Sequence, residues 1–279
     1  MNRKFKFLIL IVMFVFICTG CANADVTRAI RHSGFSLSNT EFVCPTLYPE
    51  SSGSGNFDKI RFLTSTYAIT TDGTIYKLSI GQYYSNDTNC KKADFTPRVL
   101  SVFDDKIVKT DDKKIYNLSS TNPDGSFVEV TSKDSNYYVY QALMSDNNVL
   151  KVYTVNQEKG YYYVLMRDGN IYNFVVSKNG NNVVGVSNTS IAYSKSNFGG
   201  DIIDFSYMGD SPSTFVRTNN AFFRMTVQNK EECTTYADVR CEYKMTMDEG
   251  LTKYKDQILA FSGSFLITTY GKEFTVSNI

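Results

Sequence analysis

The sequence predicts an all-β protein in which one hairpin unit recurs. Three observations carry this prediction: 20 Tyr and 20 Phe among 279 residues, short apolar runs that alternate with polar residues, and a motif that returns along the chain. Aromatic and β-branched residues favour strands, and alternation is typical of strands buried on one face. No segment of about 12 residues has a convincing helical period, and a short helix over Val26 to Arg31 is the best exception.

Residues 1–20 read as an export signal. A basic start, MNRKFK, precedes an apolar run from Phe7 to Ile17, and Cys18-Thr19-Gly20-Cys21 follows at once. The run is shorter than the roughly 20 apolar residues of a transmembrane helix, and its layout is that of a cleaved secretory leader. The Gly20-Cys21 junction resembles the lipobox of bacterial lipoproteins. This resemblance implies that Cys21 receives a diacylglycerol and becomes the new N-terminus.

A second cleavage site follows directly after Cys21. Ala22-Asn23-Ala24 suits ordinary signal peptidase, and cleavage after Ala24 would release a soluble protein that begins at Asp25. We expect the lipid anchor, because the apolar run leads straight to Cys21, and secretion is the alternative. Two acyl chains, palmitate among them, are enough for stable attachment to the cell membrane.

The charge of the mature chain argues against nucleic acid as a partner. Residues 1–20 hold three of the 29 Lys+Arg and none of the 28 Asp+Glu, so the chain from Cys21 carries 26 basic and 28 acidic residues. It contains no block of like charges, so neither nucleic acid nor anionic lipid headgroups are predicted to bind. Membrane attachment would come from the lipid alone.

Four cysteines remain beside Cys21: Cys44, Cys90, Cys233 and Cys241. Four cysteines allow three pairings. Proximity favours a disulfide between Cys233 and Cys241, which flank seven residues, and elimination then leaves Cys44 with Cys90. Free thiols are the alternative. No zinc site is expected, since the chain has no C-x-x-C and His32 is its only histidine.

A strand–turn–strand unit recurs through the chain. Three close copies and two weaker ones span 67–78, 107–118, 163–174, 215–225 and 266–276. The aromatic residues that close them, at 76, 116, 172, 223 and 274, are separated by 40, 56, 51 and 51 residues. Another apolar run precedes each copy. Each unit therefore offers at least three strands in a meander, with an apolar face that it cannot bury alone.

A tight turn is expected at the centre of each unit. Asp72-Gly73 and Asp168-Gly169 supply the positive-φ positions of a two-residue hairpin turn. Asn219-Asn220 tolerates the same conformation at some cost, whereas Asp112-Lys113 and Tyr270-Gly271 match it less well. These five turns are predicted to be structural.

A period of about 40–55 residues built from meanders is typical of a β-propeller. We expect a single propeller of about five blades over 56–279, with 21–55 as a tether and N-terminal segment. The last unit ends almost at the C-terminus and lacks an outer strand, so residues 36–48 are expected to supply one and close the ring. The alternative is an irregular β-sandwich whose hairpins merely look alike.

The D-G-x-I-Y core of the unit resembles the repeats of two propeller families. One is the regulator-of-chromosome-condensation-like repeat, and the other is the quinoprotein-like repeat of outer-membrane assembly lipoproteins. The resemblance covers five patches of about a dozen residues each and implies a propeller. Because the chain has no Trp, it lacks the tryptophan position of the quinoprotein type, and no cofactor is expected.

Residues suited to catalysis are sparse. A single histidine nearly excludes a Ser-His-Asp triad or a metal–histidine site. A glycosidase-like carboxylate pair needs two acids within about 5–10 Å, and the candidates are Asp104, Asp105, Asp111, Asp112, Asp201, Asp204 and Asp210. Their spacing is not that of a calcium loop. Tyrosine clusters at 83–84, 137–140 and 161–163 suit protein or glycan contacts, although core packing is the simpler explanation.

We therefore expect a non-catalytic, membrane-tethered module that binds a protein or glycan partner outside the cytoplasm. An anchored or secreted enzyme that acts on polysaccharide through paired carboxylates is the first alternative. A scaffold for envelope assembly is the second. An enzyme would need a deep acidic pocket, and a shallow, neutral, tyrosine-lined site would count against it.

Intact mass spectrometry of the membrane-extracted protein checks the anchor. We expect a mature N-terminus at Cys21 whose mass includes a diacylglycerol, because Gly20-Cys21 directly follows the apolar run. An unmodified chain that starts at Asp25 would contradict this expectation.

Overall fold

The computed structural model describes residues 24–41, 60–64, 66–78, 90–209, 211, 213–228, 242–263, 265–269 and 272–276. Strands dominate this part of the chain and its helices are short, which confirms the predicted all-β class. The strands form five antiparallel meanders of four strands each, which we number in chain order.

The meanders are built from short strands. The first contains β2 (Ile60–Leu63), β3 (Tyr67–Thr70), β4 (Ile75–Leu78) and β5 (Cys90–Lys92). The second contains β6 (Val99–Phe103), β7 (Ile107–Thr110), β8 (Ile115–Thr121) and β9 (Phe127–Glu129). The third contains β10 (Val149–Asn156), β11 (Tyr161–Met166), β12 (Ile171–Asn179) and β13 (Asn182–Tyr193). The fourth contains β14 (Ile202–Ser206), β15 (Phe215–Thr218), β16 (Phe222–Val227) and β17 (Tyr243–Met247). The fifth contains β18 (Ile258–Ser262), β19 (Phe265–Thr268), β20 (Lys272–Val276) and β1 (Phe35–Glu41).

Short helices lie in the connections. An N-terminal helix covers 24–32. The connection between the second and third meanders contains α2 (Tyr137–Leu143), and the connection between the fourth and fifth contains α3 (Glu249–Lys253). Two 3₁₀ turns cover Lys195–Phe198 and Lys255–Gln257.

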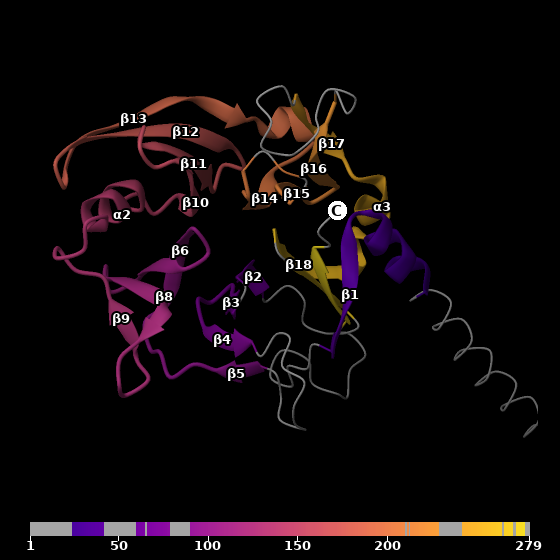
Figure 1. Ribbon diagram of the computed structural model, residues 1–279, viewed down its shortest axis with the longest axis horizontal. Helices are drawn as coiled ribbons and strands as arrows, with labels where there is room; N and C mark the ends of the chain where they lie inside the picture. The colour runs from indigo at the N-terminus through magenta and orange to yellow at the C-terminus, as the bar shows by residue number, and fades with distance from the viewer. Residues whose placement is uncertain are drawn as a thin grey trace, which may run out of the picture.

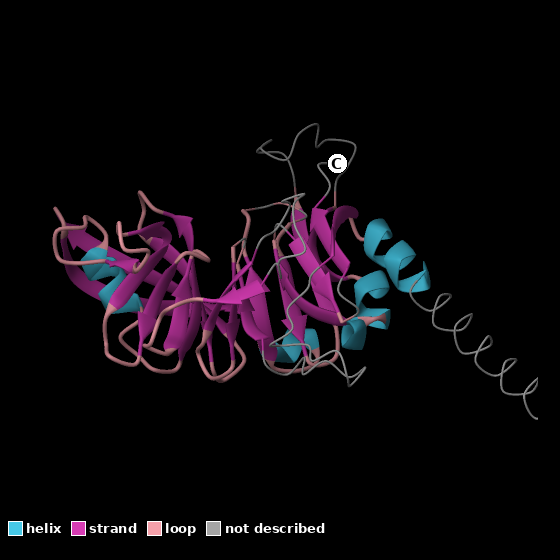
Figure 2. Ribbon diagram, turned by 90° about the horizontal axis from the view of Figure 1, so that it is seen from below, coloured by secondary structure: helices cyan, strands magenta, loops and turns pink. Residues whose placement is uncertain are grey.

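The meanders lie around a common centre (Figure 1). The first strand of each, namely β2, β6, β10, β14 and β18, is nearest to that centre, and Figure 2 shows the molecule from the side. β6 and β10 pair in parallel, with Lys151 opposite Val102, so the second and third meanders share one sheet. Among the described residues, no other hydrogen-bonded strand pair joins two meanders.

Apolar clusters fill the spaces between neighbouring meanders. Ile69 of the first and Val108 of the second share one cluster, and the next three interfaces follow the same pattern. The fifth meander packs on the first, where Leu259 and Phe265 join Ala68. Each meander therefore packs on two neighbours, one on each face, and the series of contacts returns to its start.

The N-terminal strand completes the fifth meander. β1 pairs antiparallel with β20, with Phe35 opposite Val276 and Leu37 opposite Phe274. This pairing agrees with the expectation that residues 36–48 supply the outer strand, although the strand covers 35–41 and residues 42–48 lie outside the described part.

The helix over 24–32 is tied to the fourth and fifth meanders, and it includes the predicted segment Val26 to Arg31. Val26 and Ile30 are fully buried in the cluster between these two meanders. Just after the helix, Ser33 Oγ donates a hydrogen bond to Asp248 at 2.7 Å. The same carboxylate caps α3, because it accepts a hydrogen bond from Leu251 N at 2.9 Å.

The turn at the centre of the first unit differs from the prediction. Thr70 N donates to Thr74 O at 3.0 Å, so the loop holds three residues, 71–73, and not two. Gly73 alone has a positive φ, of +85°, which is the geometry of a three-residue hairpin with a left-handed last residue. Asp72 contributes through its carboxylate, which accepts hydrogen bonds from Thr70 Oγ1 and Thr74 N. The aspartate is thus favoured by its side chain and not by its own φ.

The second and third meanders repeat this loop. Lys113 and Gly169 are the left-handed residues, with φ of +68° and +82°. The carboxylates of Asp112 and Asp168 accept hydrogen bonds from the N–H two residues further on, at 3.1 and 3.0 Å. Lys113 is exposed, so its side chain is accommodated in solvent at this turn.

The turn of the fourth unit is closed by a different set of hydrogen bonds. Asn219 and Asn220 do not have positive φ, so the expected left-handed conformation was wrong here. Instead, Thr218 Oγ1 accepts hydrogen bonds from Asn220 N at 3.2 Å and Ala221 N at 3.0 Å, and these close the turn. Tyr270-Gly271, the expected fifth turn, lies outside the described residues.

Each first strand has a register shift at the same place, typical of a β-bulge. In β2 the shift lies between Ile60 and Phe62, and the other four first strands shift at the equivalent point. We call the residues within the shifts the bulge residues: Arg61, Leu100, Leu150, Ile203 and Leu259. The residues after them are the post-bulge residues: Phe62, Ser101, Lys151, Asp204 and Ala260. A bulge redirects side chains, so each set occupies equivalent positions near the common centre.

Gly73 and Gly169 hold the start of the following meander. Val99 N donates to Gly73 O at 3.1 Å, and Ile202 N donates to Gly169 O at 3.0 Å. A Cβ on Gly73 would lie 2.7 Å from Val99 N, and one on Gly169 would lie 2.7 Å from the Cβ of Asp201. Glycine is required at both places, because it accepts a left-handed φ and allows the close approach.

Replacing either glycine with alanine is expected to destabilise the fold. Gly73→Ala and Gly169→Ala should each lower the free energy of unfolding by about 2–5 kcal/mol, since the left-handed φ and the clash both contribute. Gly125→Ala is the matched control, because Gly125 has a φ of +86° and no atom within 4 Å of its added Cβ. It should lose only about 1–2 kcal/mol. Urea-induced unfolding measures the losses, and equal losses in all three variants would contradict the role of the close contact.

Candidate functional site

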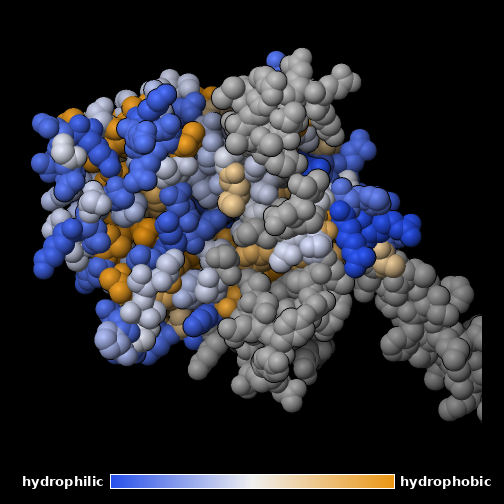
Figure 3. Space-filling model, viewed as in Figure 1, coloured by the Kyte–Doolittle hydropathy of each residue, from blue (hydrophilic) through white to orange (hydrophobic). Residues whose placement is uncertain are grey.

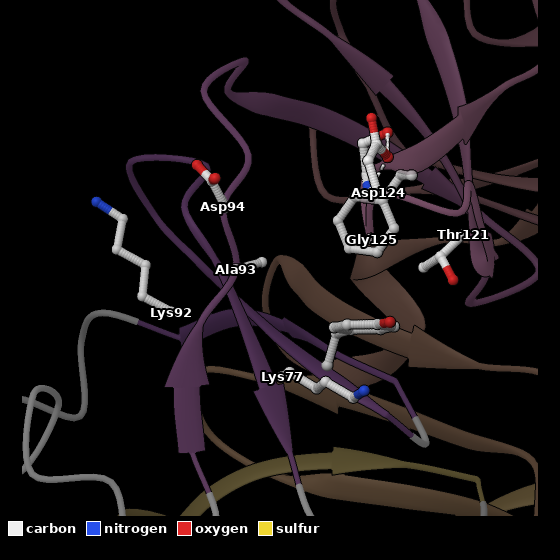
Figure 4. A pocket seen from close by; sticks show the side chains of 10 residues that line it. Lys77, Lys92, Ala93, Asp94, Thr121, Asp124 and Gly125 are labelled. Carbon is white, nitrogen blue, oxygen red and sulfur yellow. Dashed lines mark hydrogen bonds between the residues drawn. The ribbon is translucent and has the colours of Figure 1, made fainter.

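A groove of about 600 Å³ opens between the first and second meanders (Figure 4). Its walls come from β3, β4 and β5 on one side and from the turn between β8 and β9 on the other. The residues that matter for its chemistry are Tyr67, Lys77, Lys92, Asp94, Asp124 and Phe127. Its size falls within the roughly 300–1,000 Å³ of typical ligand sites.

The floor of the groove is aromatic. Tyr67 and Phe127 are buried, and their rings meet edge to face with centroids 5.4 Å apart. Phe95 extends the contact, with its ring 5.2 Å from Phe127 and 5.0 Å from Tyr116. Burial raises the pKa of the Tyr67 hydroxyl, so the floor carries no charge at neutral pH. The rings come from both meanders and fix the two walls relative to each other.

The rim of the groove is charged and balanced. Lys77, Lys92 and Asp94 are exposed, and no hydrogen bond or ion pair to another described residue holds their side chains. On the opposite wall, Asp124 accepts hydrogen bonds from Ser126 Oγ at 2.6 Å and Ser126 N at 2.9 Å, and these hold its pKa below the usual value. Figure 4 shows Lys92 and Asp94 on one wall and Asp124 on the other. The two lysines and two aspartates leave the groove formally neutral.

A second group of charges is buried near the common centre. Lys151, a post-bulge residue, has a side chain that is 1% exposed, and its Nζ lies 2.9 Å from Asp204 Oδ1 and 3.6 Å from Asp105 Oδ1. It also donates to Phe205 O at 3.0 Å. Burial alone would lower the pKa of Lys151, but the charges of Asp204 and Asp105 raise it well above its usual value. The ammonium therefore stays charged and links the second, third and fourth meanders.

An unusual backbone supplies one of these carboxylates. Asp104 and Asp105, in the turn after β6, have φ of +47° and +54°, a conformation that costs about 1–2 kcal/mol for each residue with a Cβ. Thr154 N and Oγ1 both donate to the Asp104 carboxylate at 2.8 Å, while burial raises its pKa. Tyr153 Oη donates to Asp105 at 2.8 Å. These bonds to the third meander hold the turn in place.

Most of the acids considered for catalysis lie apart. Asp111 and Asp201 form exposed ion pairs with neighbouring basic residues at 3.0 and 2.9 Å. Asp112 holds a turn, and Asp210 lies outside the described residues.

Asp105 and Asp204 are the acids that the fold brings together. They do not form a free carboxylate pair, because the Lys151 ammonium contacts both of them and the site is buried. A glycosidase pair needs room for a sugar and an acid–base role for each carboxyl group. This group is better suited to holding three meanders in register.

The other chemical candidates contribute no site. His32 is exposed on the helix over 24–32. Within the described ranges, no three His, Cys, Asp or Glu side chains gather where they would hold a metal ion.

The anchor and the disulfides fall on residues that the structure does not describe. Cys21, Cys44, Cys233 and Cys241 lie outside the described part, and for Cys90 only its backbone place in β5 is given. The lipid at Cys21 and both disulfide pairings therefore stay predictions. No helix in the described part of the chain has the length and apolar character needed to cross a membrane.

The tyrosine clusters divide between core and surface. Tyr162 is buried at 3% exposure, whereas its neighbour Tyr161 is 44% exposed. Tyr138 on α2 is 37% exposed, and the pair at 83–84 lies outside the described residues. The alternation in β11 is that of an ordinary strand, so these tyrosines mark no separate site.

Sequence reasoning missed both the buried lysine and the aromatic floor of the groove. It did not single out Lys151, although a lysine within the apolar run Val149 to Tyr153 interrupts the pattern of a buried strand. It also did not place Tyr67 beside Phe127, because these rings meet only when the first two meanders pack together.

Comparison with known proteins identifies no family for this chain. No family model matches it, and a search of curated proteins finds no match.

Removing the buried ammonium is expected to destabilise the fold strongly. Lys151→Met should lower the free energy of unfolding by about 3–5 kcal/mol, because it removes the ammonium that pairs with the buried Asp204 carboxylate. The double variant with Asp204→Leu should recover much of this loss. Ser101→Ala is the control at another post-bulge position: its buried hydroxyl has no hydrogen-bond partner in the described structure, so it should change the stability by less than about 1 kcal/mol. Urea-induced unfolding measures these changes. A double variant no more stable than Lys151→Met would contradict the pairing of Lys151 with Asp204.

Proposed function

We propose that this chain is a lipid-anchored, extracytoplasmic β-propeller that binds a protein or glycan partner in the groove between its first two meanders. The observation that carries the proposal is the groove itself: an aromatic floor, a neutral rim, and exposed charged side chains without partners in the described structure. Ligand sites of this kind combine apolar contact area with a few polar groups that fix orientation.

The propeller is supported by the pattern of contacts. Each meander packs on two neighbours, including the fifth on the first. A sandwich would instead bury each sheet against a single opposite sheet. The shared bulge in all five first strands also favours equivalent units around one centre.

The anchor is supported by the layout of the leader and by a short distance in sequence to the folded body. Val26 and Ile30, five and nine residues after Cys21, are buried between the fourth and fifth meanders. A lipid on Cys21 would hold the body close to the membrane surface. We therefore propose partners that belong to the cell envelope.

The groove chemistry suits either ligand class. A Tyr or Phe ring offers a flat apolar face to a side chain or a sugar ring. Lys77 and Asp94 are positioned to pair with opposite charges or to donate and accept hydrogen bonds from hydroxyl groups. A neutral groove favours a ligand of low net charge, such as a mixed-charge peptide or a neutral oligosaccharide.

The polysaccharide-acting enzyme receives less support. It needs two accessible carboxylates, and the acids that converge, Asp105 and Asp204, are both engaged by a buried lysine. The groove contains Asp94 and Asp124, but Lys77 and Lys92 balance their charge, so it is not acidic.

The scaffold alternative would use an exposed sheet edge. β13 is the longest strand, and Val184, Val186 and Ile191 on it are exposed at 65%, 38% and 49%. Its pairing with β12 shifts register at three places, however, and bulges are a common way to keep an edge from pairing with another chain.

Binding arrays of oligosaccharides and peptides test the proposal on the full chain in detergent. We expect a ligand of one class to be retained and its affinity to fall at least about tenfold, or about 1.4 kcal/mol, in Lys77→Glu and in Asp94→Lys. Lys133→Glu, which changes an exposed lysine away from the groove, is the matched control and should bind as well as the parent.

Two results would overturn this assignment. Binding that is equally strong in the groove variants would place the site elsewhere. Release of new reducing ends from a polysaccharide, lost in Asp105→Asn, would instead favour the enzyme.

A further inference from the structure

The aromatic floor of the groove leaves little ring surface for a ligand. Tyr67 is 7% exposed and Phe127 is 8% exposed, because their rings pack against each other at 5.4 Å and Phe127 also packs against Phe95 at 5.2 Å. Peptides and proteins are anchored mainly by apolar and aromatic side chains that become buried in a pocket. A floor that is already covered offers such an anchor little area, which disfavours a peptide.

The hydroxyl of Tyr67 is the polar group that the floor leaves without a partner. Its Oη forms no hydrogen bond with another described residue. Within the described ranges, Ser101 Oγ is the only fully buried side-chain polar atom without a partner, so Tyr67 Oη stays accessible from the groove that this residue lines. A tyrosine that buries its ring usually finds a partner for its hydroxyl. The groove is therefore where this partner would bind.

The hydroxyl is held in place and keeps its proton. More than nine-tenths of Tyr67 is buried, and its ring is fixed by the edge-to-face contact with Phe127. Burial raises the pKa of Tyr67, so the group is a neutral hydroxyl at physiological pH. A hydroxyl can donate one hydrogen bond and accept others, and another hydroxyl group matches it in either direction.

The rim adds further donors and acceptors on both walls. Lys77 and Lys92 donate, Asp94 accepts, and the hydroxyl of Thr121 does both. All four side chains are exposed, and none is held by a hydrogen bond or ion pair to another residue in the described part of the chain. Figure 4 shows Asp94 and Thr121 on opposite walls. A ligand between the walls thus meets mixed donors and acceptors on either side.

The charge of the groove favours a neutral ligand. Lys77 and Lys92 balance Asp94 and Asp124, so the groove has no net field to attract an ion. Ion pairs with exposed side chains contribute little in water, so a charged ligand would gain little from this rim. Hydrogen bonds from neutral hydroxyl groups to ammonium and carboxylate groups need no opposite charge on the ligand.

We propose that the groove binds a neutral oligosaccharide, with one sugar hydroxyl hydrogen-bonded to the hydroxyl of Tyr67. Further sugar hydroxyls accept from Lys77 and donate to Asp94 at the rim. This inference rests on the proposed function, because it names the ligand class of the same groove. It goes further in excluding peptides and charged glycans, and it identifies Tyr67 as a residue that determines specificity.

Oligosaccharide and peptide arrays test the ligand class on the full chain, in a detergent without a sugar headgroup. The oligosaccharides include neutral ones, such as cellotetraose and chitotetraose, and a charged one, tetragalacturonate. We expect a neutral oligosaccharide to bind more tightly than any charged oligosaccharide or peptide. Its affinity should change less than about twofold between roughly 50 and 500 mM sodium chloride, because salt screens only charge–charge interactions.

Tyr67→Phe then tests the hydroxyl. It keeps the ring and removes one oxygen, so the neutral oligosaccharide should bind about three- to tenfold more weakly, as expected for one lost hydrogen bond. The urea midpoint should stay unchanged, because this hydroxyl has no partner in the described structure. Tyr138→Phe, on α2 and away from the groove, is the matched control and should bind like the parent.

The failure of this inference can be told apart from the failure of the proposed function. A peptide or charged oligosaccharide that binds best, and is lost in Lys77→Glu, would overturn the inference and leave the groove as the binding site. Full affinity for the neutral oligosaccharide in Tyr67→Phe would also overturn it. If nothing on either array binds, both proposals are wrong.

Discussion

The structure depends on one constraint: each meander has apolar side chains on both faces and can bury them only between two neighbours. The cluster that joins the fifth meander to the first matters most, because without Leu259 and Phe265 against Ala68 both end meanders would expose an apolar face. Strand pairing contributes little to this association, since only β6 and β10 pair across meanders among the described residues. The architecture is therefore held mainly by side-chain packing, to which single hydrogen bonds between neighbouring meanders, such as Val99 N to Gly73 O, are added.

The shared bulge in the first strands gives the chain a place for variation. Because each bulge redirects two side chains near the common centre, the five copies offer equivalent positions that packing does not fully determine. At the post-bulge positions this freedom allows Lys151 and Asp204 to face each other from adjacent meanders. At the bulge positions it allows one arginine among four aliphatic residues. Differences between copies of a repeat are thus more informative about function here than the repeat itself.

Local pattern predicted a large part of this fold. The strands flanking each unit, the short helix over Val26 to Arg31 and the origin of the outer strand of the fifth meander followed from alternation, composition and the missing strand near the C-terminus. The turn type did not, because D-G is compatible with loops of two or three residues and the Thr70–Thr74 pairing decides between them. The sites were less predictable still. Lys151 and Asp204 are far apart in sequence, and only the register of β10 and β14 brings them within 2.9 Å. A single charged residue in an apolar strand signals a buried partner without saying which one.

The pairing of β1 with β20 has a consequence for the order in which the molecule is made. The ribosome synthesises Phe35 among the first folded residues and Val276 among the last, so the strand made first must wait for the strand made last. Contacts this distant in sequence form late and slowly. A chain truncated before Lys272 would keep β1 unpaired and would lack Phe274 in the cluster that buries Val26 and Ile30. Closure of the fifth meander thus separates full-length molecules from incomplete ones, and quality control of newly made protein would act on the edge that only incomplete chains leave open.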